Sequence, residues 1–148
     1  MDTISTNKGN PFVGWFEIPV HNLDRARLFY EALFAITLHP HEEELPGAGQ
    51  RRLAIFPFQP GEGTVGALVH HPGWMAPAPR GQLLYFHSPT GDLTKDVAIA
   101  RQAGGTILLE PSPLADKRGY IAILEDTEGN RIALFSPLPQ FSKKNQPK

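Results

Sequence analysis

Hydrophobic and polar positions alternate along the chain in one pattern that occurs twice. Residues 13–20 are rich in aromatic and β-branched side chains and predict a strand. Residues 24–34 carry apolar side chains at helical spacing and predict a helix. Three short strands are expected next, at residues 37–41, 51–56 and 64–70. Pro46–Gly47 and Pro60–Gly61 predict the turns between these strands, and the acidic run Glu42–Glu44 is expected in a loop.

The same order of elements returns after a segment dense in proline and glycine. Residues 82–87 predict a strand, and residues 93–103 predict a helix that ends at Gly104–Gly105. Three more strands are expected at residues 106–109, 120–125 and 131–136. The chain therefore divides into a first module at residues 11–71, a linker at residues 72–81 and a second module at residues 82–137.

The two modules also match in sequence. Residues 62–69 align without gaps on residues 128–135, with Glu, Gly, Ala and Leu coinciding in place. Leu53–Ile55 aligns in the same way on Ile121–Ile123. Because this match coincides with the repeated order of elements, it favours a duplication. The predicted fold class is α+β, built from two βαβββ modules.

Composition narrows the class of protein. The chain has 148 residues, of which 41% are hydrophobic and 20% are charged, as in a compact domain of ordinary size. A net charge of −1 argues against a nucleic-acid partner, and the absence of cysteine excludes disulfides and thiolate chemistry. No apolar run approaches the ~20 residues that span a bilayer, and the first ten residues lack the apolar stretch of a signal peptide. We therefore expect a soluble cytoplasmic protein without a membrane partner.

Several short motifs resemble the vicinal oxygen chelate superfamily, which includes glyoxalase I, extradiol dioxygenases and bleomycin-resistance proteins. The resembling segments are Trp15–Val20, Leu23–Ala26, Phe29–Tyr30, Gln102–Gly105 and Glu125–Ile132. This resemblance covers residues 11–137 and implies that the two modules form a paired curved sheet around a cup for a small molecule. It also implies a homodimer. It does not select a reaction, because one scaffold hosts many chemistries.

Metal-dependent members of that superfamily place one His, Glu or Gln ligand on the first and last strand of each module. An ungapped match assigns these four positions to Trp15, Ala67, Leu83 and Ala133. None of these side chains offers a donor to a divalent cation, so we expect no metal and no cofactor. A shift of two residues in the first strands would bring in Glu17 and Tyr85, which leaves a displaced metal site as an alternative.

Glu17 is the candidate catalytic residue. Alternate residues of a strand share a face, so Glu17 points the same way as Trp15. In an apolar cup this carboxyl group would act as a general base or a hydrogen-bond acceptor. Glu17 is equally well explained as a carboxylate at a sheet edge, bonded to a backbone amide or an arginine. Trp15 is expected in core or rim packing, or as the floor of the cup that stacks on a planar ligand.

Three further side chains are candidate ligand contacts in the second module. Tyr85 and His87 alternate in phase with Leu83 and would complete a polar cluster with Glu17 around an oxygenated ligand. Alternatively, Tyr85 fills core space and His87 lies in solvent at the end of its strand. Phe135 would line an aromatic cup together with Trp15, or pack in the core.

Three classes of function remain open. The first is a binder that sequesters a small molecule, as in bleomycin resistance. The second is a lyase or dioxygenase-type enzyme that uses a displaced metal or Glu17 as acid and base. The third is an interaction module whose cup is filled by its own side chains. We favour a metal-independent binder of an unidentified small molecule, because all four ligand positions are apolar within an otherwise matching pattern.

Overall fold

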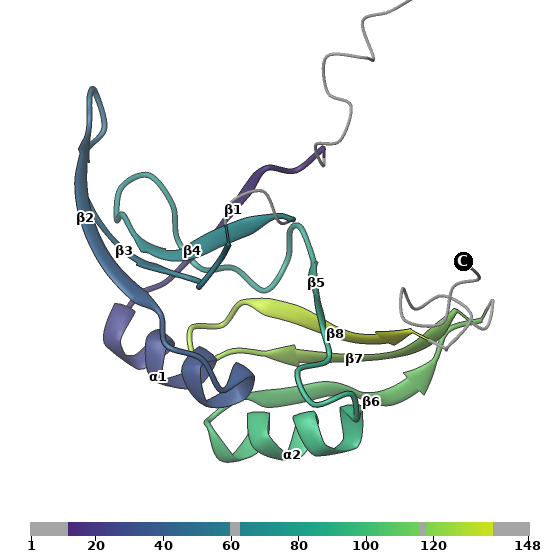
Figure 1. Cartoon of the computed structure of the whole chain (residues 1–148). Helices are drawn as coiled ribbons and strands as arrows, with labels where there is room; N and C mark the ends of the chain where they lie inside the picture. Colours follow the sequence, from purple (N-terminus) through teal and green to yellow (C-terminus); the bar gives the residue numbers. More distant parts are fainter. Residues whose placement is uncertain (1–11, 60–62, 116–117, 138–148) are drawn as a thin grey trace, which may run out of the picture. The chain divides into compact units, whose positions relative to one another are not determined.

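The computed structural model describes residues 12–59, 63–115 and 118–137, and it contains the predicted order of elements twice (Figure 1). The first series is β1 (Trp15–Pro19), α1 (Leu23–Phe34), β2 (His39–Leu45), β3 (Gly49–Ile55) and β4 (Val65–His70). The second series is β5 (Leu84–His87), α2 (Leu93–Gln102), β6 (Thr106–Pro113), β7 (Gly119–Glu125) and β8 (Arg131–Pro137). The α+β class with two βαβββ modules is confirmed. Pro11 and the turn predicted at Pro60–Gly61 lie outside the described residues.

Each series forms a four-stranded sheet with the same topology. The strand orders are β1-β4-β3-β2 and β5-β8-β7-β6. In both sheets the outer first strand runs parallel to the last strand, with Glu17 opposite Ala67 and Tyr85 opposite Ala133. The equivalent register in the two sheets is what a duplicated module requires. It also places Pro19 on an outer strand, where its missing N–H is tolerated.

The described elements form two compact units. The first contains β1, β2, β3 and β4, and the second contains residues 24–36 of the α1 region together with β5, α2, β6, β7 and β8. Neither α1 nor α2 is long and apolar enough to cross a membrane. The boundaries of the sequence modules at residues 11–71 and 82–137 stay a prediction.

The second unit is built on the apolar face of its sheet. Leu124, Ile132 and Leu134 on this face are fully buried, as are Val97 and Ala100 of α2, which contacts β6, β7 and β8. The opposite face of β5 and β8 carries Tyr85, His87, Ala133 and Phe135, because side chains alternate along each strand. One face of this sheet therefore forms the core of the second unit, and the candidate residues Tyr85, His87 and Phe135 lie on the opposite face.

The turn between β7 and β8 is tied to α1 by buried polar side chains. Asp126 accepts hydrogen bonds from the backbone N–H groups of Glu128 and Asn130, at 2.8 and 2.9 Å, and from the Tyr30 hydroxyl at 2.6 Å. Glu128 forms a two-pronged ion pair with Arg25, with N–O distances of 2.7 and 3.0 Å. The hydrogen bond and the charge of Glu128 raise the pKa of Arg25. These residues of the resembling motifs therefore hold the fold together.

The acidic run belongs to a strand, which corrects the expectation of a loop. Glu43 lies opposite Arg51 in the β2–β3 ladder and pairs with it, and Glu44 accepts a hydrogen bond from Gln50 at 3.1 Å. Cross-strand partners of this kind stabilise a hairpin that strand propensity alone does not predict. The turn predicted at Pro46–Gly47 closes this hairpin, and Gly47 adopts a φ of 85° there.

Candidate functional site

Trp15 and Glu17 lie on one face of the first sheet. Trp15 is the first residue of β1, and Glu17 lies opposite Ala67 of β4, so the three side chains share this face. The indole of Trp15 is 42% exposed, and its Nε1 donates a hydrogen bond to the Glu17 carboxylate at 3.1 Å. An exposed indole and a carboxylate therefore stand side by side on β1.

Glu17 is also paired with an arginine that sequence reasoning did not single out. The Nη1 atom of Arg51 lies 2.9 and 3.0 Å from the two Glu17 carboxylate oxygens, and the exposed fractions of the two side chains are 12% and 18%. This is the arginine-bonded alternative considered for Glu17. The carboxylate is therefore engaged by a cation and an indole N–H on a half-buried surface.

Arg51 joins three of the four strands of the first sheet. It bonds Glu43 of β2 through Nε at 2.8 Å and, because β4 lies between β3 and β1, it reaches Glu17 across that strand. Burial lowers the pKa of Arg51, and the bond to Glu43 and the charges of Glu43 and Glu17 outweigh that effect, so the pKa is raised. The hydrogen bond from Arg51 lowers the pKa of Glu43. Arg51, Leu53 and Ile55 are alternate residues of β3, so the sequence does indicate that the Arg51 side chain points to the same face as these two apolar side chains.

A buried apolar cluster lies on the same face of the first sheet as this network. Ala67, Leu53 and Val69 form a buried apolar cluster on the same face, and Ile55 and Met75 pack against it. The face therefore combines an ion-pair chain with an apolar cluster that is already buried. The exposed indole of Trp15 is the apolar group that can contact an organic molecule beside these polar side chains.

In the second unit, Tyr85, His87 and Phe135 lie on the face opposite the buried core. The side chain of Tyr85 is 56% exposed, and the rings of His87 and Phe135 lie 6.4 Å apart, centroid to centroid. Tyr85 therefore does not fill core space in its unit. The spacing of Tyr85 and His87 predicted that these two share a face, and the register of β5 with β8 adds Phe135 to it.

The four positions that resemble metal-ligand positions have equivalent sequence offsets in the two units, although Trp15 is in β1 and Leu83 directly precedes β5. Trp15 stands two residues before the Glu17–Ala67 pair, and Leu83 stands two residues before the Tyr85–Ala133 pair. An indole, two methyl groups and an isobutyl group supply no ligand for zinc, iron or manganese, so these residues do not fit a metal. Within residues 12–59, 63–115 and 118–137, no group of three or more His, Asp or Glu side chains is placed to hold a metal ion.

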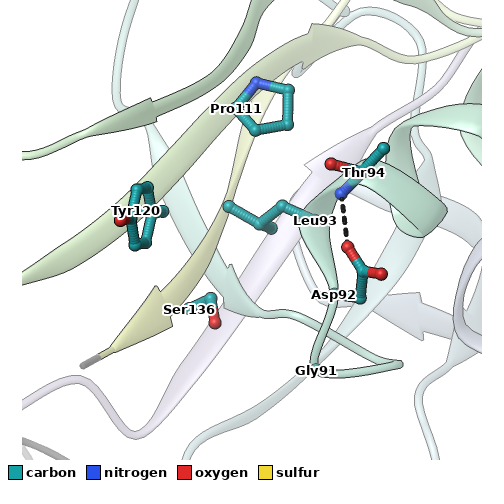
Figure 2. A pocket seen from close by; sticks show the side chains of 7 residues that line it. All are labelled: Gly91, Asp92, Leu93, Thr94, Pro111, Tyr120 and Ser136. Carbon is teal, nitrogen blue, oxygen red and sulfur yellow. Dashed lines mark hydrogen bonds between the residues drawn. The ribbon is translucent and has the colours of Figure 1, made fainter. Parts of the chain in front are cut away.

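A hollow of about 570 Å³ lies on the other side of the second sheet, at the start of α2 (Figure 2). Leu93, Pro111 and Tyr120 surround it. The Asp92 side chain accepts the backbone N–H groups of Thr94 and Lys95, so it already occupies the amino end of the helix. This hollow contains none of the candidate residues, and we assign the carboxylate there to helix capping.

Comparison with known families identifies the chain. The model of the Glyoxalase/Bleomycin resistance protein/Dioxygenase superfamily matches residues 12–134. The chain therefore belongs to this superfamily, which is the one that its motifs resemble. No curated protein matches the chain.

Solved structures agree with this fold. A variant of glyoxalase I from Zea mays superposes with a TM-score of 0.62 and 21% identity over 83% of this chain, which spans 45% of the maize chain. A glyoxalase/bleomycin resistance protein from Albidiferax ferrireducens gives a TM-score of 0.61 and 22% identity over 84% of this chain and 98% of its own. A glyoxalase-related enzyme from Fulvimarina pelagi gives a TM-score of 0.63 and 13% identity over 83% of this chain and 86% of its own. At these identities the likeness establishes the fold alone.

Proposed function

We propose that this protein binds a small organic molecule without a metal ion. The carrying observation is that no residue at the four positions resembling metal-ligand positions carries a donor: Trp15 and Leu83 each stand two residues before the residue opposite an alanine, and these alanines are Ala67 and Ala133. The strand face of the first unit offers the Trp15 indole and the Glu17 carboxylate. The strand face of the second unit offers the ligand contacts Tyr85, His87 and Phe135.

The surroundings of Glu17 favour binding over catalysis. A general base needs a free lone pair directed at the proton that it removes. Both carboxylate oxygens of Glu17 lie within 3.0 Å of Arg51, and one also accepts the Trp15 indole N–H. We therefore assign Glu17 to ligand binding. The enzymatic alternative, with Glu17 as acid and base, requires that the protein turns over a bound compound and that Glu17→Gln abolishes this turnover.

Two measurements test this function. Elemental analysis of the purified chain is expected to find no stoichiometric zinc, iron, manganese or nickel, and one equivalent of any of them held by strand residues would contradict the proposal. A thermal-shift screen of planar aromatic compounds is expected to find at least one that raises the melting temperature, because a ligand that binds only the folded state stabilises it.

A matched pair of tryptophan variants locates the binding surface. Trp15→Ala is expected to weaken the affinity for such a compound by about tenfold or more, since a stacked indole contributes a large contact area. Trp74→Ala removes an indole that is 65% exposed and lies outside β1, and it is expected to leave the affinity unchanged. Equal losses in both variants, or none in either, would place the ligand elsewhere.

A further inference from the structure

A second hollow, of about 310 Å³, lies on the candidate face of the second unit. Its lining residues are Pro79, Arg80, Gly81, Gln82, Leu83, Ile123 and Arg131. Arg131 stands two residues before Ala133, and Ile123 lies opposite Ala133 in the β7–β8 ladder. The hollow therefore adjoins the Tyr85–Ala133 pair, on the same side of the sheet.

The segment that carries Arg80 is held against the sheet by a hydrogen bond. The backbone N–H of Ala78 donates to Asn130 Oδ1 at 3.2 Å, and the Asn130 side chain also donates to Asp126 at 3.2 Å. Asn130 is buried and directly precedes Arg131. Arg80 and Arg131 are 51 positions apart in sequence. These contacts bring both residues to the lining of the same hollow.

The two arginines differ from the others that carry ion pairs. Arg25, Arg51 and Arg101 each pair with a carboxylate. Within the described part of the chain, the guanidinium groups of Arg80 and Arg131 make neither a hydrogen bond nor an ion pair. Glu125 lies opposite Arg131 in the ladder, yet no ion pair joins the two side chains. Two guanidinium groups therefore face one hollow with their donors unused.

We propose that this hollow binds the anionic group of an organic ligand. Guanidinium groups bind carboxylate and phosphate oxygens through paired N–H donors, and two of them suit one such group. Leu83 and Ile123 give the hollow an apolar floor for the uncharged part of the molecule. The ligand class is thus a small organic carboxylate or phosphate. This inference rests on the proposed function, because it names the charge of the ligand that the second unit takes.

Titration of the full chain with matched probes tests the charge preference. Phenyl phosphate and benzoate represent the two anion chemistries, benzyl alcohol is the neutral analogue, and inorganic phosphate lacks the apolar part. Binding is followed by calorimetry and by the amide chemical shifts of Leu83 and Ile123. We expect at least one aromatic anion to bind at least about tenfold more tightly than benzyl alcohol or inorganic phosphate, and to weaken as salt is added.

Arginine variants test the residues. The double variant with Arg80→Gln and Arg131→Gln is expected to bind aromatic anions about tenfold or more weakly, and its affinity for benzyl alcohol is expected to stay unchanged. Arg52→Gln, at an exposed arginine of β3 in the first unit, is the matched control and is expected to change nothing. Thermal unfolding is measured for each variant, and a transition like that of the natural chain shows that the fold is intact.

The outcomes separate this inference from the proposed function. If the double variant binds aromatic anions as the natural chain does, or if the natural chain binds neither anion, the inference fails. Neutral aromatic compounds that still bind through Trp15 would leave the proposed function standing in that case. If neither neutral nor anionic compounds bind, both fail.

Discussion

At the scale of single residues, Tyr30 shows how a motif residue acts through a distant partner. Its side chain is fully buried, and its hydroxyl donates to Asp126, which shapes the β7–β8 turn. Burial raises the pKa of Tyr30 well above its ordinary value, and the charge of Asp126 adds to that effect. The sequence places both residues in resembling motifs. Their contact could not be predicted, because 96 positions separate them.

Tyr30→Phe is expected to lower the free energy of unfolding by about 1–3 kcal/mol, because buried Asp126 loses a donor. Urea denaturation at neutral pH measures this change. Tyr120→Phe is the control, since Tyr120 is 46% exposed, and its effect is expected to stay within about 0.5 kcal/mol. Equal effects of the two variants would show that the Tyr30–Asp126 bond contributes little.

The raised pKa of Tyr30 also predicts a loss of stability in alkali. Above pH ~10 the unfolded tyrosine releases its proton while the folded one keeps it, so the unfolded state binds fewer protons and stability falls as pH rises. The stabilising effect is complete below pH ~10. Tyr30→Phe is expected to flatten this part of the pH profile, measured by denaturation between neutral and strongly alkaline pH. A profile as steep as that of the natural chain would contradict the assignment.

At the scale of elements, the pairing of β1 with β4 depends on a glycine. Gly66 lies opposite Phe16 in the parallel ladder, and the Phe16 ring packs over it. A Cβ atom at Gly66 would lie 2.3 Å from the Phe16 carbonyl oxygen, well inside contact distance. The β-rich pattern of residues 64–70 predicted the strand. It could not predict the close approach, which depends on which strand lies beside β4.

Gly66→Ala is expected to lower the free energy of unfolding by about 1–3 kcal/mol, because backbone atoms of β1 must shift to admit the methyl group. Chemical denaturation measures this loss. Gly14→Ala is a matched control, since a Cβ atom there would meet no heavy atom within 4 Å. We expect the control to fall within about 1 kcal/mol of the natural chain. An unperturbed Gly66→Ala protein would contradict the close packing of β1 on β4.

At the scale of the whole molecule, each four-stranded sheet ends in two outer strands, β1 and β2 in the first and β5 and β6 in the second. Backbone groups on outer strands are open to pairing with another chain. Together with the family resemblance, this supports our proposal of a homodimer. The cytoplasmic location and the absence of a nucleic-acid partner stay predictions from composition.

Sedimentation analysis tests the homodimer proposal. The chain has a mass of 16.3 kDa, and we expect a species of twice that mass at micromolar concentration. Raising the salt concentration is expected to leave the mass unchanged, because backbone pairing between strands is not a contact between charges. A single species of monomer mass across the concentration range would refute the proposal.

Local patterns predicted the order of elements and its repetition, because hydrophobic periodicity and turn residues act over short distances, and short motifs indicated the family. The sequence by itself also determined that the four resembling ligand positions are apolar. Only the tertiary structure brought Arg51 to Glu17 and Arg80 to Arg131. These contacts depend on strand order, on register and on a hydrogen bond from Ala78 to Asn130. None of them leaves a local pattern, because the partners lie far apart along the chain and meet only when the sheets form.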